Sequence, residues 1–156
     1  MNLRGWIVAL GLLGSTIGLS VAQGINQPST EQQYVPRLGD IMDAAQTRHS
    51  KLWFAAKAGN WELAAYELRQ LKASLVEAAM LYSGIPVSNV TTLAQPLQSV
   101  SDAIDAKDGR RFAKSFGELT DGCNSCHRSM GRAFILMRQP VDGPFGNQVF
   151  PPQGKP

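Results

Sequence analysis

The chain has 156 residues, of which 44% are apolar and 17% are charged, and its formal net charge is +3. This length suits one domain with its own core, and a charged fraction below the roughly 25% of typical globular chains excludes a disordered, solvating chain. Two cysteines are too few for a disulfide scaffold, and the lysines and arginines are spread among acids, so no basic stripe indicates nucleic-acid binding.

Residues 1–22 have the pattern of an export signal. Arg4 lies in a short charged region, Trp6–Leu19 is an apolar run without charge, and Ser20-Val21-Ala22 places small residues where a signal peptidase cleaves. A retained membrane anchor is the alternative, but the run is shorter than the about 20 residues that a spanning helix needs. We therefore expect cleavage after Ala22, export to the periplasm, and a mature chain that does not span the membrane.

A polar leader arm at residues 23–35 precedes two segments with helical periodicity. Apolar positions recur at steps of three and four in both segments. Gly59 ends the first segment and Asn60 can cap the second, which ends at Ser83-Gly84-Ile85-Pro86. The two stripes consist of Leu38, Met42, Ala45, His49, Leu52 and Ala56, and of Trp61, Ala64, Leu68, Leu71, Leu75, Ala78 and Tyr82.

Two further helices are predicted after the second segment. Pro96 places the start of the third helix close to itself, and Asp108 can cap the fourth. No segment alternates with the period of a strand. The sequence therefore predicts an all-α domain at residues 36–138, an antiparallel four-helix bundle, followed by a Pro/Gly-rich tail at 139–156. The stripes are Leu93, Leu97, Val100 and Ile104, and then Phe112, Phe116, Leu119, Cys123, Cys126, Met130, Ala133 and Met137.

The chemistry is carried by Cys123-Asn124-Ser125-Cys126-His127. C-x-x-C-H is the attachment sequence of a c-type haem. Two thiols about one helical turn apart can form thioethers with the two vinyl groups at one edge of the porphyrin. The imidazole of His127 can then bind the iron from one face. The sequence thus predicts covalent haem c, with Cys123 and Cys126 as tethers and His127 as the proximal iron ligand.

Three other uses of these residues compete with haem. A disulfide between Cys123 and Cys126 would close a very small loop and stabilise little. A thioredoxin-like redox pair requires a βαβ context, which this chain lacks. A zinc site could recruit Cys123, Cys126, His127 and His49, but the adjacent Cys126 and His127 would have difficulty reaching one tetrahedral metal.

The motif lies in the last predicted helix, and this arrangement resembles the class II, cytochrome c′-like, proteins. The resemblance covers residues 36–138, with Cys123–His127 as its specific motif, and the long tail after the motif departs from the family pattern. Residues 48–54 (RHSKLWF) and Asn60-Trp61 are also similar to bacterial monohaem c-type cytochromes. The resemblance implies that the first helix faces the distal side of the haem and that such bundles often pair through their first two helices.

The distal side offers two candidate ligands, Met42 and His49. They lie two turns apart on the first stripe, about 10 Å along the helix, so one of them at most can lie over the iron. An open distal site, with both residues serving as packing, is the third possibility. Met130 and Met137 are expected on the same helix as the motif, where neither can reach the opposite face of the ring. Trp53, Phe54 and Trp61 can either wall a haem or belong to the core.

We therefore expect an exported monohaem c-type cytochrome that carries single electrons between redox partner proteins by Fe(III)/Fe(II) cycling, and not an enzyme. The leading alternative is a five-coordinate haem protein that binds or senses NO or CO on the first-helix side. A third is a small haem subunit that docks on a dehydrogenase through the tail at 140–156.

Overall fold

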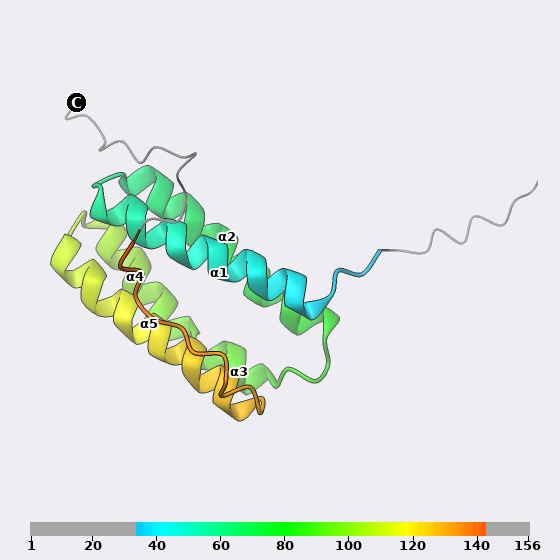
Figure 1. Ribbon diagram of the computed structural model, residues 1–156. Helices are drawn as coiled ribbons and strands as arrows, with labels where there is room; N and C mark the ends of the chain where they lie inside the picture. The colour runs from blue at the N-terminus through cyan, green and yellow to red at the C-terminus, as the bar shows by residue number, and fades with distance from the viewer. Residues whose placement is uncertain (1–33, 143–156) are drawn as a thin grey trace, which may run out of the picture. The chain divides into compact units, whose positions relative to one another are not determined.

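The computed structural model describes residues 34–142, apart from the side chain of Val87 (Figure 1). The predicted export signal, most of the leader arm and the tail from residue 143 lie outside the described residues. Within them every regular element is a helix, which confirms the all-α part of the predicted fold class. The elements are α1 Leu38–Lys57, α2 Trp61–Leu81, α3 Val87–Thr92, α4 Ala94–Asp105 and α5 Gly109–Ser129.

The helix boundaries follow local capping chemistry. The backbone of Gly59 has a φ of 74°, which a glycine adopts without the cost that a Cβ imposes, and α1 ends two residues before it. The side chain of Asn60 accepts a hydrogen bond from the amide of Leu63 at the start of α2. The carboxylate of Asp108 accepts from the amides of Arg110 and Arg111 at the start of α5. These caps confirm the predicted stops and starts.

Two features of the helices differ from the prediction. The short helix α3 was not expected, and α5 was expected to continue to Met137 but ends at Ser129. The backbone of Gly131 has a φ of 68°, so the chain leaves the helical conformation there and turns back. Residues 132–139 form an irregular segment, which we call the return segment.

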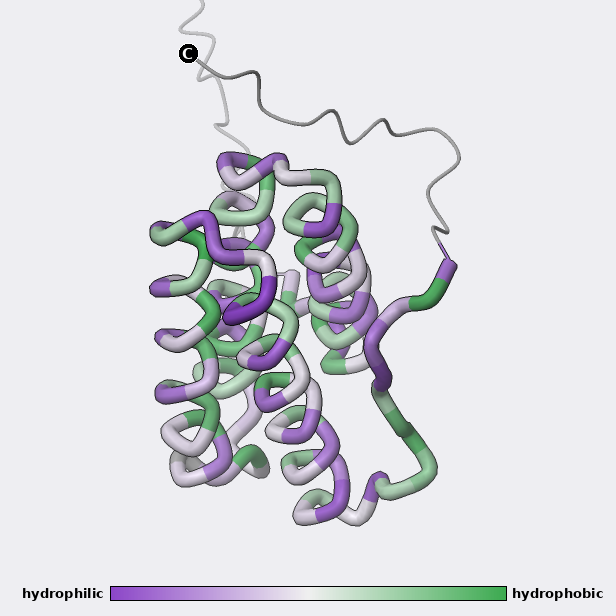
Figure 2. The backbone as a smooth tube through the Cα atoms, turned by 90° about the vertical axis from the view of Figure 1, so that its left-hand side faces the viewer, coloured by the Kyte–Doolittle hydropathy of each residue, from purple (hydrophilic) through white to green (hydrophobic). Residues whose placement is uncertain are grey.

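The helices pack as two pairs. Figure 1 shows α1 alongside α2 and α4 alongside α5; α2 also contacts α4, and α1 contacts α5. Figure 2 shows apolar residues recurring along the helices between polar ones. One apolar cluster joins α1, α2, α4 and α5, and its largest fully buried members are Phe112, Phe116, Leu52, Leu119 and Val100. Each such side chain contributes about 1.5–3 kcal/mol through its burial.

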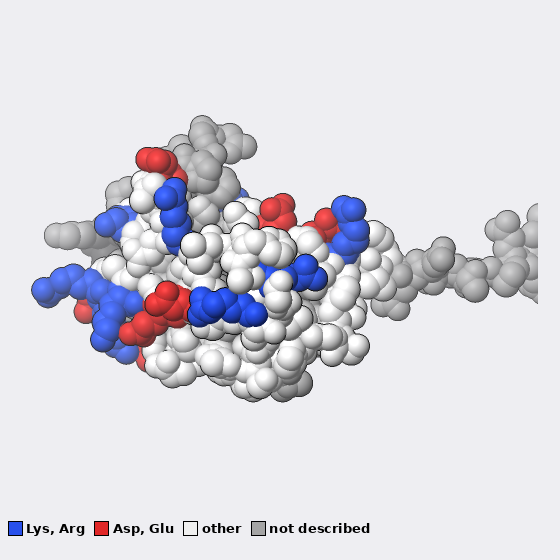
Figure 3. Space-filling view, turned by 60° about the horizontal axis from the view of Figure 1, so that its bottom comes forward, with Lys and Arg blue, Asp and Glu red and all other residues white. Residues whose placement is uncertain are grey.

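Charged side chains lie mostly outside this core. On the face seen in Figure 3, basic and acidic side chains are interspersed and much of the surface is uncharged. Glu67 is the exception, because its side chain is buried and forms an ion pair with Arg48 at 3.2 Å, which joins α1 to α2. None of the helices within residues 34–142 combines the length and the apolar run needed to cross a membrane.

Candidate functional site

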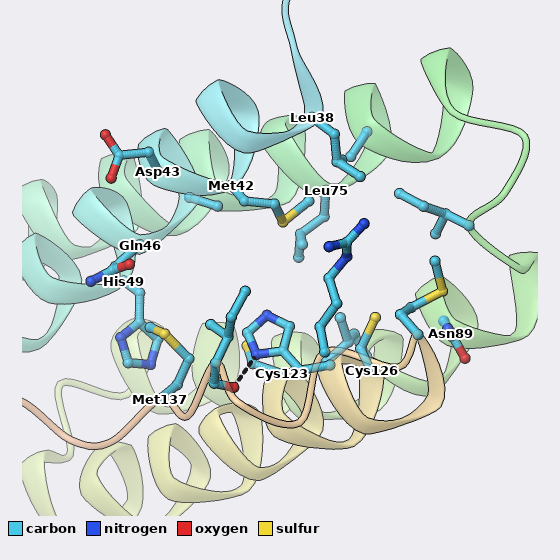
Figure 4. A pocket seen from close by; sticks show the side chains of 18 of the residues that line it. Leu38, Met42, Asp43, Gln46, His49, Leu75, Asn89, Cys123, Cys126 and Met137 are labelled. Atoms are coloured by element: carbon cyan, nitrogen blue, oxygen red, sulfur yellow. Dashed lines mark hydrogen bonds between the residues drawn. The ribbon is translucent and has the colours of Figure 1, made fainter.

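A cavity of about 330 Å³ lies between the two helix pairs, at the end where α1 begins and α5 ends (Figure 4). Its volume falls within the about 300–1,000 Å³ of pockets that enclose small molecules. The wall is mostly apolar. Members of the wall from the first three helices are Leu38, Met42, Ala45, His49, Leu71, Leu75, Ala78 and Val90, and those from α5 and the return segment are Cys123, Cys126, His127, Met130, Arg132, Ile135 and Met137.

Aromatic rings fill the space between α1 and α5 beyond the cavity. The ring of Trp53 lies 5.0 Å from that of Phe116 and 6.1 Å from that of Phe112, and the ring of Trp61 lies 6.3 Å from that of Phe112. Trp53 and Trp61 are partly buried and pack against the core, and neither is among the residues that line the cavity. We call this region, defined by Trp53, Trp61, Phe112 and Phe116, the aromatic end.

The two cysteines of the motif lie on the cavity wall. Both are free thiols, and Figure 4 shows them on α5, across the cavity from Met42 of α1. Burial and the neighbouring Cys126 raise the pKa of Cys123 to about 11, and burial raises the pKa of Cys126. Reactive redox cysteines have lowered pKa values, so this environment does not suit a thioredoxin-like pair.

The imidazole of His127 is held from one side. Its Nδ1 lies 2.9 Å from the carbonyl oxygen of Ile135 on the return segment, the hydrogen bond drawn dashed in Figure 4. A carbonyl only accepts, so Nδ1 carries a proton, and in the neutral ring Nε2 then has the lone pair. Metal-binding histidines are commonly fixed in this way, with the second ring nitrogen donating to a backbone carbonyl.

The return segment runs back along α5 because Asn124, a residue of the motif, forms hydrogen bonds with it. The side-chain amide of Asn124 donates to the carbonyl of Met137 at 2.9 Å, and its oxygen accepts from the amide of Met137 at 2.7 Å. Farther along, the amide of Gln139 donates to the carbonyl of Ala113 at 3.2 Å. Asn124 is buried, and the two hydrogen bonds satisfy both ends of its side chain.

The expectation that Met130 and Met137 share the helix of the motif is wrong. Met130 caps α5, and Met137 lies on the return segment, whose course brings it to the cavity wall beside His49 (Figure 4). The chain reverses because Gly131 adopts the left-handed conformation and Asn124 captures the backbone of Met137. Gly131 was the available sequence signal for this reversal, but the apolar stripe extended across it.

His49 is buried at the boundary between the cavity and the aromatic end. Its Nε2 lies 2.9 Å from the hydroxyl of Thr120, and its ring centroid lies 4.3 Å from that of Phe116. The single hydroxyl proton of Thr120 is donated to the carbonyl of Phe116 at 2.8 Å, so Nε2 of His49 is the donor to Thr120. Burial lowers the pKa of His49 to about 4, and the ring is neutral at pH 7.

The residues present fit a covalently attached haem. The wall provides two thiols one turn apart, an imidazole with a free Nε2, and an apolar lining against which a flat macrocycle can pack. Within residues 34–142 no three His, Cys, Asp or Glu side chains gather as a metal site, so the four-ligand zinc alternative finds no preformed cluster there. Haem iron takes one or two ligands from the protein and does not need such a cluster. Comparison with protein-family models, with curated proteins and with solved structures found no match for this chain.

Proposed function

We propose that this chain is an exported, monohaem c-type cytochrome that carries single electrons between redox partner proteins in the periplasm. Its haem c is attached through Cys123 and Cys126, and His127 is the proximal ligand. The proposal includes the class II arrangement, in which α1, α2, α4 and α5 make up a four-helix bundle around the haem. The observation that carries the proposal is the placement of all three motif side chains on one largely apolar cavity, with Nδ1 of His127 bonded to Ile135.

Each part of the site has a definable role. Haem iron supplies reversible one-electron exchange between Fe(III) and Fe(II) when the group is bound. The apolar wall limits the access of water, and the carbonyl of Ile135 holds the ring of His127 through its Nδ1. Arg132 is the cation among the lining residues and is suited to pair with a haem propionate.

Met42 is the distal ligand that the geometry supports better. Nε2 of His49 is already bonded to Thr120, and the ring packs on Phe116, so ligation through Nε2 would break a buried hydrogen bond. Ligation by Met42 would break no such hydrogen bond. Figure 4 shows its side chain extending into the cavity from α1, opposite the two cysteines. Its thioether is a common axial ligand of electron-transferring c-type cytochromes.

A gas-binding protein with five-coordinate iron is the second candidate. The observation that favours it is the hydrogen bond between His49 and Thr120, which keeps His49 from the iron. A haem that Met42 does not bind either would have an open distal position. The two candidates differ in one measurable property, the response of the reduced protein to carbon monoxide.

The decisive experiment is an absorption spectrum of the protein produced with haem-maturation factors: oxidised, reduced, and reduced under carbon monoxide. We expect covalent haem and a low-spin spectrum that is indifferent to carbon monoxide. The double variant Cys123→Ala/Cys126→Ala should contain no covalent haem, whereas Ser125→Ala, which changes an exposed spacer residue, should retain it.

Three variants then identify the distal ligand. Met42→Ala should convert the spectrum to high spin and make it respond to carbon monoxide, while His49→Ala and Met137→Ala stay low-spin. A wild-type protein that is already high-spin and shifts under carbon monoxide would favour the gas-binding alternative. Absence of covalent haem from the wild type would overturn both.

A further inference from the structure

The first spacer residue of the attachment motif has a contact pattern that thioether formation does not require. Asn124 lies between the two tethering cysteines, yet it is buried, and both its hydrogen bonds go to the backbone of Met137. The second spacer residue, Ser125, is exposed, and it accepts a hydrogen bond from the side chain of Arg128 on the same helix. Asn124 therefore bonds to the return segment, whereas Ser125 bonds within its own helix.

The bonds of Asn124 fix the same segment that holds His127. Met137 is two residues after Ile135, whose carbonyl accepts from Nδ1 of His127. In an extended chain two residues span about 7 Å, so pinning the backbone at Met137 restricts where the carbonyl of Ile135 can lie. A turn from Arg132 to Ile135, closed by a 2.9 Å hydrogen bond, restricts it from the other side.

We propose that Asn124 is a positioning residue: by pairing with the backbone of Met137 it anchors the return segment, so that the carbonyl of Ile135 holds the His127 ring with Nε2 toward the cavity. This inference rests on the proposed function for its consequence at the iron. The motif then encodes both the attachment of the haem and, through its spacer, the orientation of the ligand. A hydrogen-bond acceptor at Nδ1 tunes the electron density at the metal through the histidine that it holds.

The first test measures the anchoring without reference to haem. Trypsin can cut after Arg138, an exposed residue on the return segment. In Asn124→Ala we expect cleavage at this bond to accelerate on the order of tenfold, because two hydrogen bonds that oppose local opening are lost. Ser125→Ala is the matched control and should be cut at the wild-type rate.

The second test measures the consequence for His127 through the midpoint reduction potential of the haem-loaded protein. A weakened hydrogen bond at Nδ1 makes the imidazole a poorer donor and disfavours Fe(III), so Asn124→Ala should have a higher potential. We expect the ferric/ferrous equilibrium to change by about threefold to tenfold, where tenfold corresponds to about 59 mV. Ser125→Ala should keep the wild-type potential.

A variant of Met137, the partner in the contact, provides an independent test in case Asn124→Ala does not fold. Met137→Pro removes the amide that donates to Asn124, and Met137→Leu keeps it. Met137→Pro should reproduce both effects, whereas Met137→Leu should be cut at the wild-type rate. Combining Met137→Pro with Asn124→Ala should add little.

Unchanged cleavage in both Asn124→Ala and Met137→Pro would overturn the anchoring. Faster cleavage with an unchanged potential would make Asn124 merely structural and would also overturn the proposal. A wild-type chain without covalent haem is distinguishable from both results, because it removes the proposed function itself and the role at the iron with it.

Discussion

The same two helices, α1 and α5, are packed tightly at one end of the molecule and held apart by a cavity at the other. At the aromatic end, Trp53 of α1 packs on Phe112 and Phe116 of α5. At the cavity end, the facing residues are Met42 and Ala45 on α1 and Cys123 and Cys126 on α5. One pair of helices thus carries two kinds of interface.

The difference follows from the side chains. Large rings at the aromatic end pack directly on one another between the helices, as close-packed interiors require. About three turns of helix away, the side chains are smaller or unbranched and cannot fill the same gap. A largely apolar void of this size is unfavourable in a protein that has nothing to place in it. The contrast is therefore the physical argument that the cavity end is built for an occupant.

The aromatic end should account for more of the stability than the cavity wall. Phe116 is fully buried against His49, Trp53 and Phe112. Phe116→Ala should lower the free energy of unfolding by about 3–5 kcal/mol. Leu75→Ala, which trims a half-buried residue of the cavity wall, should cost less than half as much. Denaturant midpoints with unchanged m values would measure both, and equal losses would contradict the comparison.

Under the proposed function, removing the haem should loosen the cavity end and spare the aromatic end. The wild-type chain can be made without maturation factors and compared with the loaded protein by hydrogen exchange, so that the two samples have the same sequence. We expect amides at 40–47 and 123–129 to lose protection on the order of 100-fold, because their helices lose a packing partner. Amides at 50–57 and 110–120 should change by a few-fold at most. Uniform loss along both helices would show that the two ends are not distinct.

The sequence predicted the features that depend on near neighbours. Asn60, Gly59 and Asp108 act within three residues of themselves, and their capping roles were correctly predicted. The periodic stripes gave the helices and most of their buried faces. The attachment motif is equally local, since its five residues are contiguous, and its use for haem remains a prediction.

The features that sequence reasoning missed depend on contacts between distant residues. The return segment is held by Asn124 bonding to Met137, thirteen residues later, and by His127 bonding to Ile135. The spacing of Met130, Ala133 and Met137 continues the helical stripe, so periodicity favoured a longer α5. The hydrogen bond between His49 and Thr120 joins residues 71 positions apart, so the local sequence pattern could not predict it either.

His49, at the boundary between the two ends, should make the stability depend on pH. Burial lowers its pKa from 6.5 to about 4, and a buried ring must stay neutral while the unfolded chain takes up a proton. Stability is therefore fully present above pH 6.5 and is lost as the pH falls toward 4. Over the interval from pH 6.5 to 4.5 this loss amounts to about 2–3 kcal/mol.

His49→Phe offers a clean comparison, because the hydroxyl of Thr120 still donates to the carbonyl of Phe116 and is not left unpaired. Its ring can also keep the contact with Phe116. Urea denaturation at several pH values should show that, between pH 6.5 and 4.5, the variant loses about 2–3 kcal/mol less stability than the wild type. Because carboxylates titrate identically in both proteins, parallel curves would mean that His49 is not the group that couples folding to pH.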